Sequence, residues 1–115
     1  MTERTDAPEN DGGSFARALP SDALRPGRIA VATVGGKKIA LGLAGGEPFA
    51  CLDECPHAGS SFAEGRVIGD RLICPFHGAR FDVANGLCVN APYSPLSLFK
   101  SRIVDGFVEV AIDGE

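Results

Sequence analysis

The 115-residue sequence contains no tryptophan, one tyrosine and only two histidines. It also has no run of about 18 apolar residues, the length that a membrane-spanning helix needs. Its first residues are polar and acidic, so we expect no secretory signal there. With a formal net charge of −4 and no basic stripe, the sequence argues against a nucleic-acid partner. These absences predict a cytoplasmic protein, in which cysteines more often bind metal or react than form disulfides.

The pattern of turns predicts an all-β chain. Fifteen glycines and eight prolines favour short strands over a helical bundle. We expect a flexible tail over residues 1–14 and one domain over residues 15–115, in which residues 53–69 are loop-like and a short helical turn begins at Ser21. Apolar and β-branched segments end at glycine pairs, Asn-Gly or Asp-Gly, which are typical of hairpins. The predicted strands cover residues 28–34, 37–44, 47–52, 71–74, 78–83, 87–90, 96–105 and 107–112.

Both histidines lie in one short segment, CPHAGSSFAEGRVIGDRLICPFH. Cys55 and His57 form a Cys-x-His pair, and after sixteen intervening residues Cys74 and His77 form a Cys-x-x-His pair. Two such turns facing each other would offer two thiolates and two imidazoles to a metal centre. Zinc fingers usually place both cysteines before both histidines, whereas here each half supplies one sulfur and one nitrogen.

This constellation resembles the Rieske family, in which two histidines replace two cysteines on one iron of a [2Fe–2S] cluster. The resemblance implies that Cys55 and Cys74 hold the inner iron, and that His57 and His77 hold the outer, more exposed iron. Neutral imidazoles in place of thiolates make the oxidised site less negative. The reduction potential is therefore higher than that of clusters with four cysteines.

The resemblance extends over about residues 28–112. The stretch CPFHGARFDVANG looks like the second cluster loop with its hairpin, and residues 91–95 look like the proline-bearing third loop that covers the cluster. The family fold implied is an antiparallel β-sandwich. It carries a small cluster-binding subdomain formed by two loops, here within about residues 53–95.

Departures from the family pattern indicate a low potential. High-potential members carry one extra cysteine in each cluster loop, joined as a disulfide, and this chain has Ser60 and Phe76 there instead. They also carry a serine and a tyrosine that donate to the cluster sulfurs, and the matching residues here are Ala79 and Phe81. Fewer donors stabilise the reduced state less, so we expect a midpoint near the low end of the Rieske range, about −150 mV.

Other departures favour a separate electron carrier over an enzyme. Oxygenases of this family carry an arginine where this chain has Ala58, and no third histidine is available for their mononuclear iron. The resemblance therefore implies a Rieske-type ferredoxin of an aromatic-ring-hydroxylating system. It would accept one electron from a flavin-dependent ferredoxin reductase and pass it to a terminal oxygenase. We expect a monomer with no nucleic-acid or membrane partner.

Two surface features are expected around the cluster. An acidic side over residues 47–70 would dock basic patches on the partners, although it could equally be a solvated face. Its charged residues are Glu47, Asp53, Glu54, Glu64 and Asp70, against Arg66. An apolar surface would surround the cluster edge, made by Pro56, Phe62, Pro75, Phe76, Pro92 and Tyr93.

Several alternatives stay open at this point. A Rieske-like small subunit of an assimilatory nitrite reductase would share the fold, and a zinc-stabilised module would share the ligand set. The four residues could also be unrelated buried cysteines and surface histidines. Cys51 and Cys88 fall outside the motif and are expected to be small core residues. A further hypothesis is that His57 and His77 lose their outer N–H protons when the cluster is oxidised, so that the midpoint falls at alkaline pH.

Overall fold

The computed structural model describes residues 15–56, 59–75 and 78–111. The flexible tail predicted for residues 1–14 lies outside these ranges and stays a prediction. His57 and His77 lie outside them as well. No helix within the described ranges is long and apolar enough to cross a membrane.

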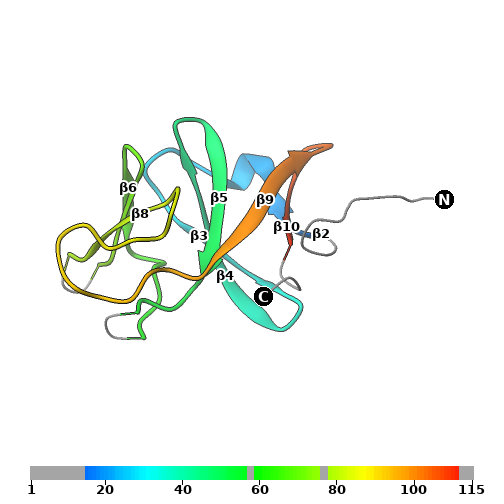
Figure 1. The fold of residues 1–115 in the computed structure, drawn as a ribbon. Coiled ribbons are helices and arrows are strands. Elements are labelled where there is room, and N and C mark those ends of the chain that lie inside the picture. Colours follow the sequence, from blue (N-terminus) through cyan, green and yellow to red (C-terminus); the bar gives the residue numbers. More distant parts are fainter. Residues whose placement is uncertain (1–14, 57–58, 76–77, 112–115) are drawn as a thin grey trace.

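The described residues form strands and one 3-10 helix, η2, at Ser21–Ala23 (Figure 1). All strand pairings are antiparallel, as predicted. The strands are β2 (Phe15–Pro20), β3 (Ala30–Val34), β4 (Lys37–Ala44), β5 (Glu47–Leu52), β6 (Arg66–Ile68), β7 (Arg71–Ile73), β8 (Arg80–Asp82), β9 (Leu98–Val104) and β10 (Phe107–Ala111).

The larger sheet has six strands in the order β2-β10-β9-β5-β4-β3. One half of the sheet is β3-β4-β5 and the other is β2-β10-β9. The two halves are paired through β5 and β9, at Ala50–Phe99 and Cys51–Leu98. The outer strands β2 and β3 also lie close together, so the sheet curls on itself. The smaller sheet, β6-β7-β8, forms a subdomain at one end of the molecule (Figure 1). The predicted sandwich with an added subdomain is confirmed, and the subdomain contains a sheet as well as loops.

The alternation of side chains along β4 and β5 separates two hydrophobic cores. Ile39 and Leu41 of β4 face a core between the two halves of the large sheet. Ala40 of β4, with Phe49 and Cys51 of β5, faces a second core beneath the subdomain. This follows from the two-residue period of a strand, which sends successive side chains to opposite faces.

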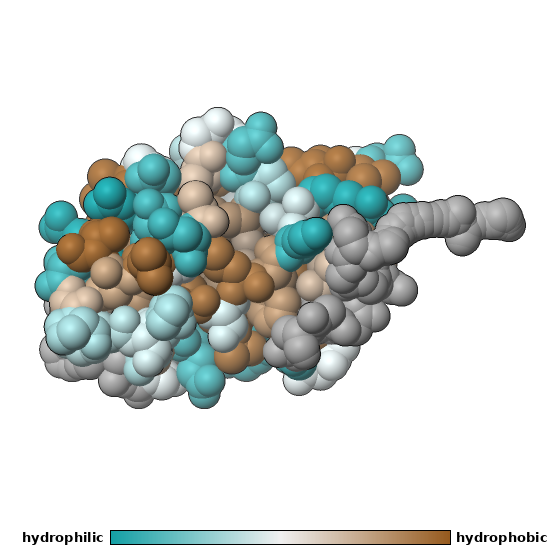
Figure 2. Space-filling view, viewed as in Figure 1, coloured by the Kyte–Doolittle hydropathy of each residue, from teal (hydrophilic) through white to brown (hydrophobic). Residues whose placement is uncertain are grey.

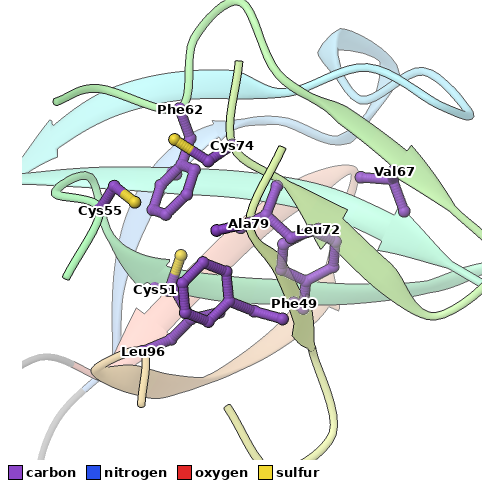
Figure 3. Packing of buried hydrophobic residues seen from close by; sticks show 11 residues of the cluster. Phe49, Cys51, Cys55, Phe62, Val67, Leu72, Cys74, Ala79 and Leu96 are labelled. Carbon is purple, nitrogen blue, oxygen red and sulfur yellow. The ribbon is translucent and has the colours of Figure 1, made fainter. Parts of the chain in front are cut away.

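The second core joins the subdomain to the sheet and contains two of the predicted ligands. Cys55 and Cys74 are each 1% exposed within it (Figure 3). Phe62 and Phe81 pack edge to face beside them, with ring centroids 6.2 Å apart. Both rings are completely buried, and the burial of each ring contributes about 1.5–3 kcal/mol to the stability of the fold. The ligand loops are therefore anchored by the core that holds the two layers together.

Several predicted boundaries differ from those observed. Residues 37–44 and 47–52 form strands as expected, but β2 and β6 were not predicted. Residues 87–90 form only an isolated bridge, between Cys88 and Phe81, instead of a strand. Ser21 is not the cap of the helical turn, because Pro20 occupies that position and makes no side-chain capping bond.

Candidate metal centre

The first ligand loop closes through two backbone hydrogen bonds around Cys55. The Cys55 N–H donates to the Ser60 carbonyl at 2.8 Å, and the Gly59 N–H donates back to the Cys55 carbonyl at 2.6 Å. Gly59 has a φ of 72°, in the left-handed region that favours glycine. The turn therefore depends on the residues four and five positions after the cysteine.

The second ligand loop repeats this pattern with the same spacing. The Cys74 N–H donates to the Ala79 carbonyl at 2.9 Å, and the Gly78 N–H donates to the Cys74 carbonyl at 3.2 Å. Gly78 has a φ of 70°. The two loops therefore share one backbone hydrogen-bonding pattern, in which Ser60 and Ala79 occupy equivalent positions.

The two loops bring the predicted cysteine ligands together. The sulfur atoms of Cys55 and Cys74 point toward one another in Figure 3. The Ser60 hydroxyl lies 4.0 Å from the Cys74 sulfur, so the loops also contact each other through side chains. The predicted ligands His57 and His77 lie outside the described residues. Within the described ranges, no group of three or more metal-ligating side chains is formed.

Asp53 supports the first loop from inside the protein. Its side chain accepts two hydrogen bonds of 2.7 Å, from the Ser61 hydroxyl and from the Phe62 N–H. The backbone N–H of Asp53 donates to the Lys38 carbonyl at 2.9 Å, and this bond connects the loop to the start of β4. Asp53 is only 7% exposed, so its assignment to the acidic docking side was wrong.

Asn90 supports the second loop from the segment that follows β8. Its Oδ1 accepts from the Arg80 N–H at 3.0 Å, and its Nδ2 donates to the Gly78 carbonyl at 3.1 Å. The Cys88 thiol also donates to Oδ1, at 3.5 Å. Asn90 thereby holds the exit of the loop that carries Cys74. The sequence carries no local signal for this role, because the bonded residues are ten and twelve positions apart.

The proline-bearing segment faces the first ligand loop across a pocket of about 340 Å³. Cys55, Pro56 and Gly59 line one side, and Ser94 and Pro95 line the other. This is the location expected for the third loop. The chain is anchored directly after this segment, because the Leu96 N–H donates to the Gly86 carbonyl and the Ser97 carbonyl accepts from the Leu52 N–H.

The surface around the loops differs in part from the one expected. Phe62 is completely buried, so its assignment to the apolar surface was wrong. Pro75 and Pro92 are exposed, whereas Pro56 and Tyr93 are half-buried; Phe76 lies outside the described residues. In Figure 2, hydrophobic residues reach the surface between hydrophilic ones, including at the end that carries β6 and β8. Of the acidic side predicted over residues 47–70, four acidic residues are exposed: Glu47, Glu54, Glu64 and Asp70.

The two cysteines outside the motif pack in the core, as predicted. Cys51 is completely buried, and Cys88 is half-buried against the same cluster of side chains. Burial, with a smaller contribution from the negative charge of Asp53, raises the pKa of Cys51 to about 12. Its thiol is therefore neutral at ordinary pH and is a poor nucleophile.

The residues that the structure describes fit the inner half of a Rieske site. Two buried thiols on matching loops, pointing toward each other, are the donors that an iron–sulfur cluster takes at its inner iron. A cysteine must be deprotonated to bind metal, and metal binding itself offsets the cost of that charge in a buried site.

Comparison with known proteins points in the same direction. The model of the Rieske [2Fe-2S] domain matches residues 14–100. Ferredoxin CarAc of Metapseudomonas resinovorans is 37% identical over 99 residues, which cover 84% of this chain and 92% of that protein. The anthranilate 1,2-dioxygenase ferredoxin subunit of Burkholderia cepacia is 37% identical over 113 residues, which cover 97% of this chain and 99% of that protein.

Solved structures share the fold. A chain in a complex of reduced oxygenase and oxidized ferredoxin in carbazole 1,9a-dioxygenase matches with a TM-score of 0.77 and 31% identity, covering 88% of this chain and 95% of that one. A putative nitrite reductase small subunit matches with a TM-score of 0.73 at 18% identity, covering 84% and 97% of the two chains. At that identity, the second match shows the fold alone.

Proposed function

This chain belongs to the Rieske [2Fe–2S] family, and we propose that it is a one-electron carrier whose cluster is held by Cys55, His57, Cys74 and His77. A cluster of this type supplies reversible one-electron storage. The observation that carries the proposal is the pair of equivalent loops that place two buried cysteine sulfurs toward each other. The histidine ligands follow from the motif spacing.

The relatives support a carrier rather than an enzyme. Of two proteins that match over almost their whole length, one is named a ferredoxin and the other is named the ferredoxin subunit of anthranilate 1,2-dioxygenase. The acceptor proposed for this chain is accordingly the terminal oxygenase of an aromatic-ring-hydroxylating system, and the donor is a flavin-dependent ferredoxin reductase. We further propose that the protein works in the cytoplasm as a monomer.

Partner docking is proposed to use the exposed acidic residues near the first loop. Glu54 directly precedes Cys55, and Glu64 follows the same loop; both are exposed. Opposite charges steer weak, fast association, and salt screens this effect over about 10 Å at 0.1 M ionic strength. The rate of electron transfer should therefore fall as ionic strength rises, and a rate that does not depend on salt would exclude this docking mode.

The surroundings of the cysteines favour a low reduction potential. Ala79 and Phe81, which stand where high-potential members have hydroxyl donors, are 2% and 0% exposed and carry no side-chain donor. We therefore expect a midpoint near about −150 mV that falls at alkaline pH as the ligand histidines lose protons. A midpoint above about +100 mV, or one independent of pH up to about 11, would contradict these two expectations.

The experiment that tests the function combines the purified protein with its candidate reductase and oxygenase. We expect substrate turnover that requires this protein and is abolished by Cys74→Ser, whereas Ser101→Ala, a change on β9 of the larger sheet, leaves it intact. Turnover that does not depend on the protein would reject the carrier role. A colourless, zinc-containing preparation would instead support the structural zinc module.

A further inference from the structure

We propose that the Ser60 hydroxyl donates a hydrogen bond to the cluster ligand Cys74 and thereby raises the reduction potential of the site. This inference rests on the proposed function. Ser60 belongs to the first ligand loop, and the inferred role is to act on Cys74, the cysteine ligand of the second loop.

The position of Ser60 follows from the equivalence of the two loops. Ser60 stands five residues after Cys55, and Ala79 stands five residues after Cys74. Each accepts the N–H of its own cysteine through its backbone carbonyl. Ala79 has no donor to offer, but Ser60 extends its hydroxyl to the sulfur of Cys74, in the opposite loop, at 4.0 Å.

The direction of the hydrogen bond follows from the chemistry of the ligand. As free groups, either the hydroxyl or the thiol could donate. A cysteine bound to iron is a thiolate, which has no proton and can only accept. The hydroxyl can rotate about its C–O bond to aim its proton at the sulfur. Ser60 is therefore the donor of this pair when the cluster is bound.

The effect on the potential follows from the charge that reduction adds. The extra electron makes the ligand sulfur more negative, so a donor stabilises the reduced form more than the oxidised form. The 4.0 Å separation is long for a hydrogen bond, so we expect a modest effect. Removing the hydroxyl should shift the one-electron equilibrium about threefold toward the oxidised form, which is about 28 mV because a tenfold change corresponds to 59 mV.

The backbone and side chain of Ser60 have separable roles, which makes the test clean. Ser60→Ala and Ser60→Gly both lose the hydroxyl but retain the carbonyl that accepts the Cys55 N–H. Ser60→Thr retains both. Ser101→Ala is the control, because Ser101 lies on β9 of the larger sheet and its hydroxyl donates to the Pro48 carbonyl at 3.2 Å, away from both ligand loops.

The experiment is a redox titration of the four variants and the parent protein, each with its cluster content and visible spectrum recorded first. We expect lower midpoints for Ser60→Ala and Ser60→Gly, and midpoints close to that of the parent for Ser60→Thr and Ser101→Ala. An unchanged midpoint in either donor-less variant with full cluster content would overturn the inference. If Ser60→Ala does not retain a cluster, Ser60→Gly decides.

The proposed function and this inference fail in different ways. A parent protein with no [2Fe–2S] spectrum would reject the function before any variant is titrated. A normal parent spectrum with an unchanged midpoint in the Ser60 variants would reject only the inference. As a second readout, the proton couplings that pulsed EPR of the reduced protein loses on exchange into D₂O should include one that is already absent from Ser60→Ala in H₂O.

Discussion

Replacing Asp53 with alanine should weaken the first ligand loop more than any other single polar change near it. The substitution removes two hydrogen bonds of 2.7 Å and leaves the buried Phe62 N–H without its acceptor. A hydrogen bond to a charged group contributes about 1.5–3 kcal/mol, and part of that gain is offset because a buried carboxylate no longer has to be desolvated. We therefore expect a net loss of about 3 kcal/mol in the free energy of unfolding.

In a domain of this size, that loss lowers the unfolding temperature by about 12 °C, at about 4 °C for each kcal/mol. The assay is thermal unfolding of the cluster-loaded protein at one scan rate, followed by far-UV circular dichroism and by visible absorption. Asp53→Asn retains an acceptor for the Phe62 N–H and should lose about half as much. Ser61→Ala removes one of the two hydrogen bonds to Asp53, together with the exposed bond from the Ala63 N–H, and should cost about 1 kcal/mol.

Asp70→Asn is the matched control, because Asp70 is exposed and its nearest ion pair, with Arg71, is 3.6 Å long with both side chains well exposed. Such a change should alter stability by no more than about 0.5 kcal/mol. If Asp53→Ala melted within about 3 °C of the parent protein, the carboxylate would not be holding the loop as we infer.

Three further predictions concern residues around the same core. Asn90→Ala removes the bonds to Gly78 and Arg80 and should speed loss of the cluster to a chelator several-fold; an unchanged rate would show that Asn90 does not support the second loop. Gly65→Ala places a Cβ against the backbone carbonyl of Ile73, which cannot move aside cheaply, so we expect a loss of about 2 kcal/mol in urea unfolding, and a neutral result would exclude the clash. The pKa of Cys51 is raised in the folded state, so its contribution to stability is complete below about pH 9 and is lost as pH rises toward 12, by about 1.4 kcal/mol per unit. Unfolding measured against pH should show this slope in the parent protein and not in Cys51→Ala, and equal slopes would refute the assignment.

Much of the larger sheet could be predicted from the sequence. The segments over residues 37–44 and 47–52 are apolar, and glycine pairs bound them as hairpin turns, so both strands were placed correctly. β6 was missed because three residues are too few to show a period, although Gly69-Asp70 between it and β7 was a usable turn signal. β2 was missed because its pairing with β10 determines its conformation more than its own composition does.

Part of the candidate site could also be predicted from the sequence, and part could not. The spacing of Cys55 and Cys74 with their histidines was enough to identify the family and the cysteine loops. The supports of those loops were not predictable, because Asp53 and Asn90 act through hydrogen bonds whose partners depend on the folded backbone. From the sequence, Asp53 was predicted to be an acidic surface residue and Phe62 to be part of the apolar surface. In the structure both side chains are buried.

We propose that two histidines bind the outer iron of the cluster, and this ligation can be tested directly. His57 and His77 are the only histidines in the sequence, so labelling histidine with ¹⁵N marks those two residues and no others. Pulsed EPR of the reduced protein should show strong couplings to two imidazole nitrogens, both changed by the label. A [2Fe–2S] signal with no histidine coupling, or a preparation that binds zinc and gives no signal, would contradict the account.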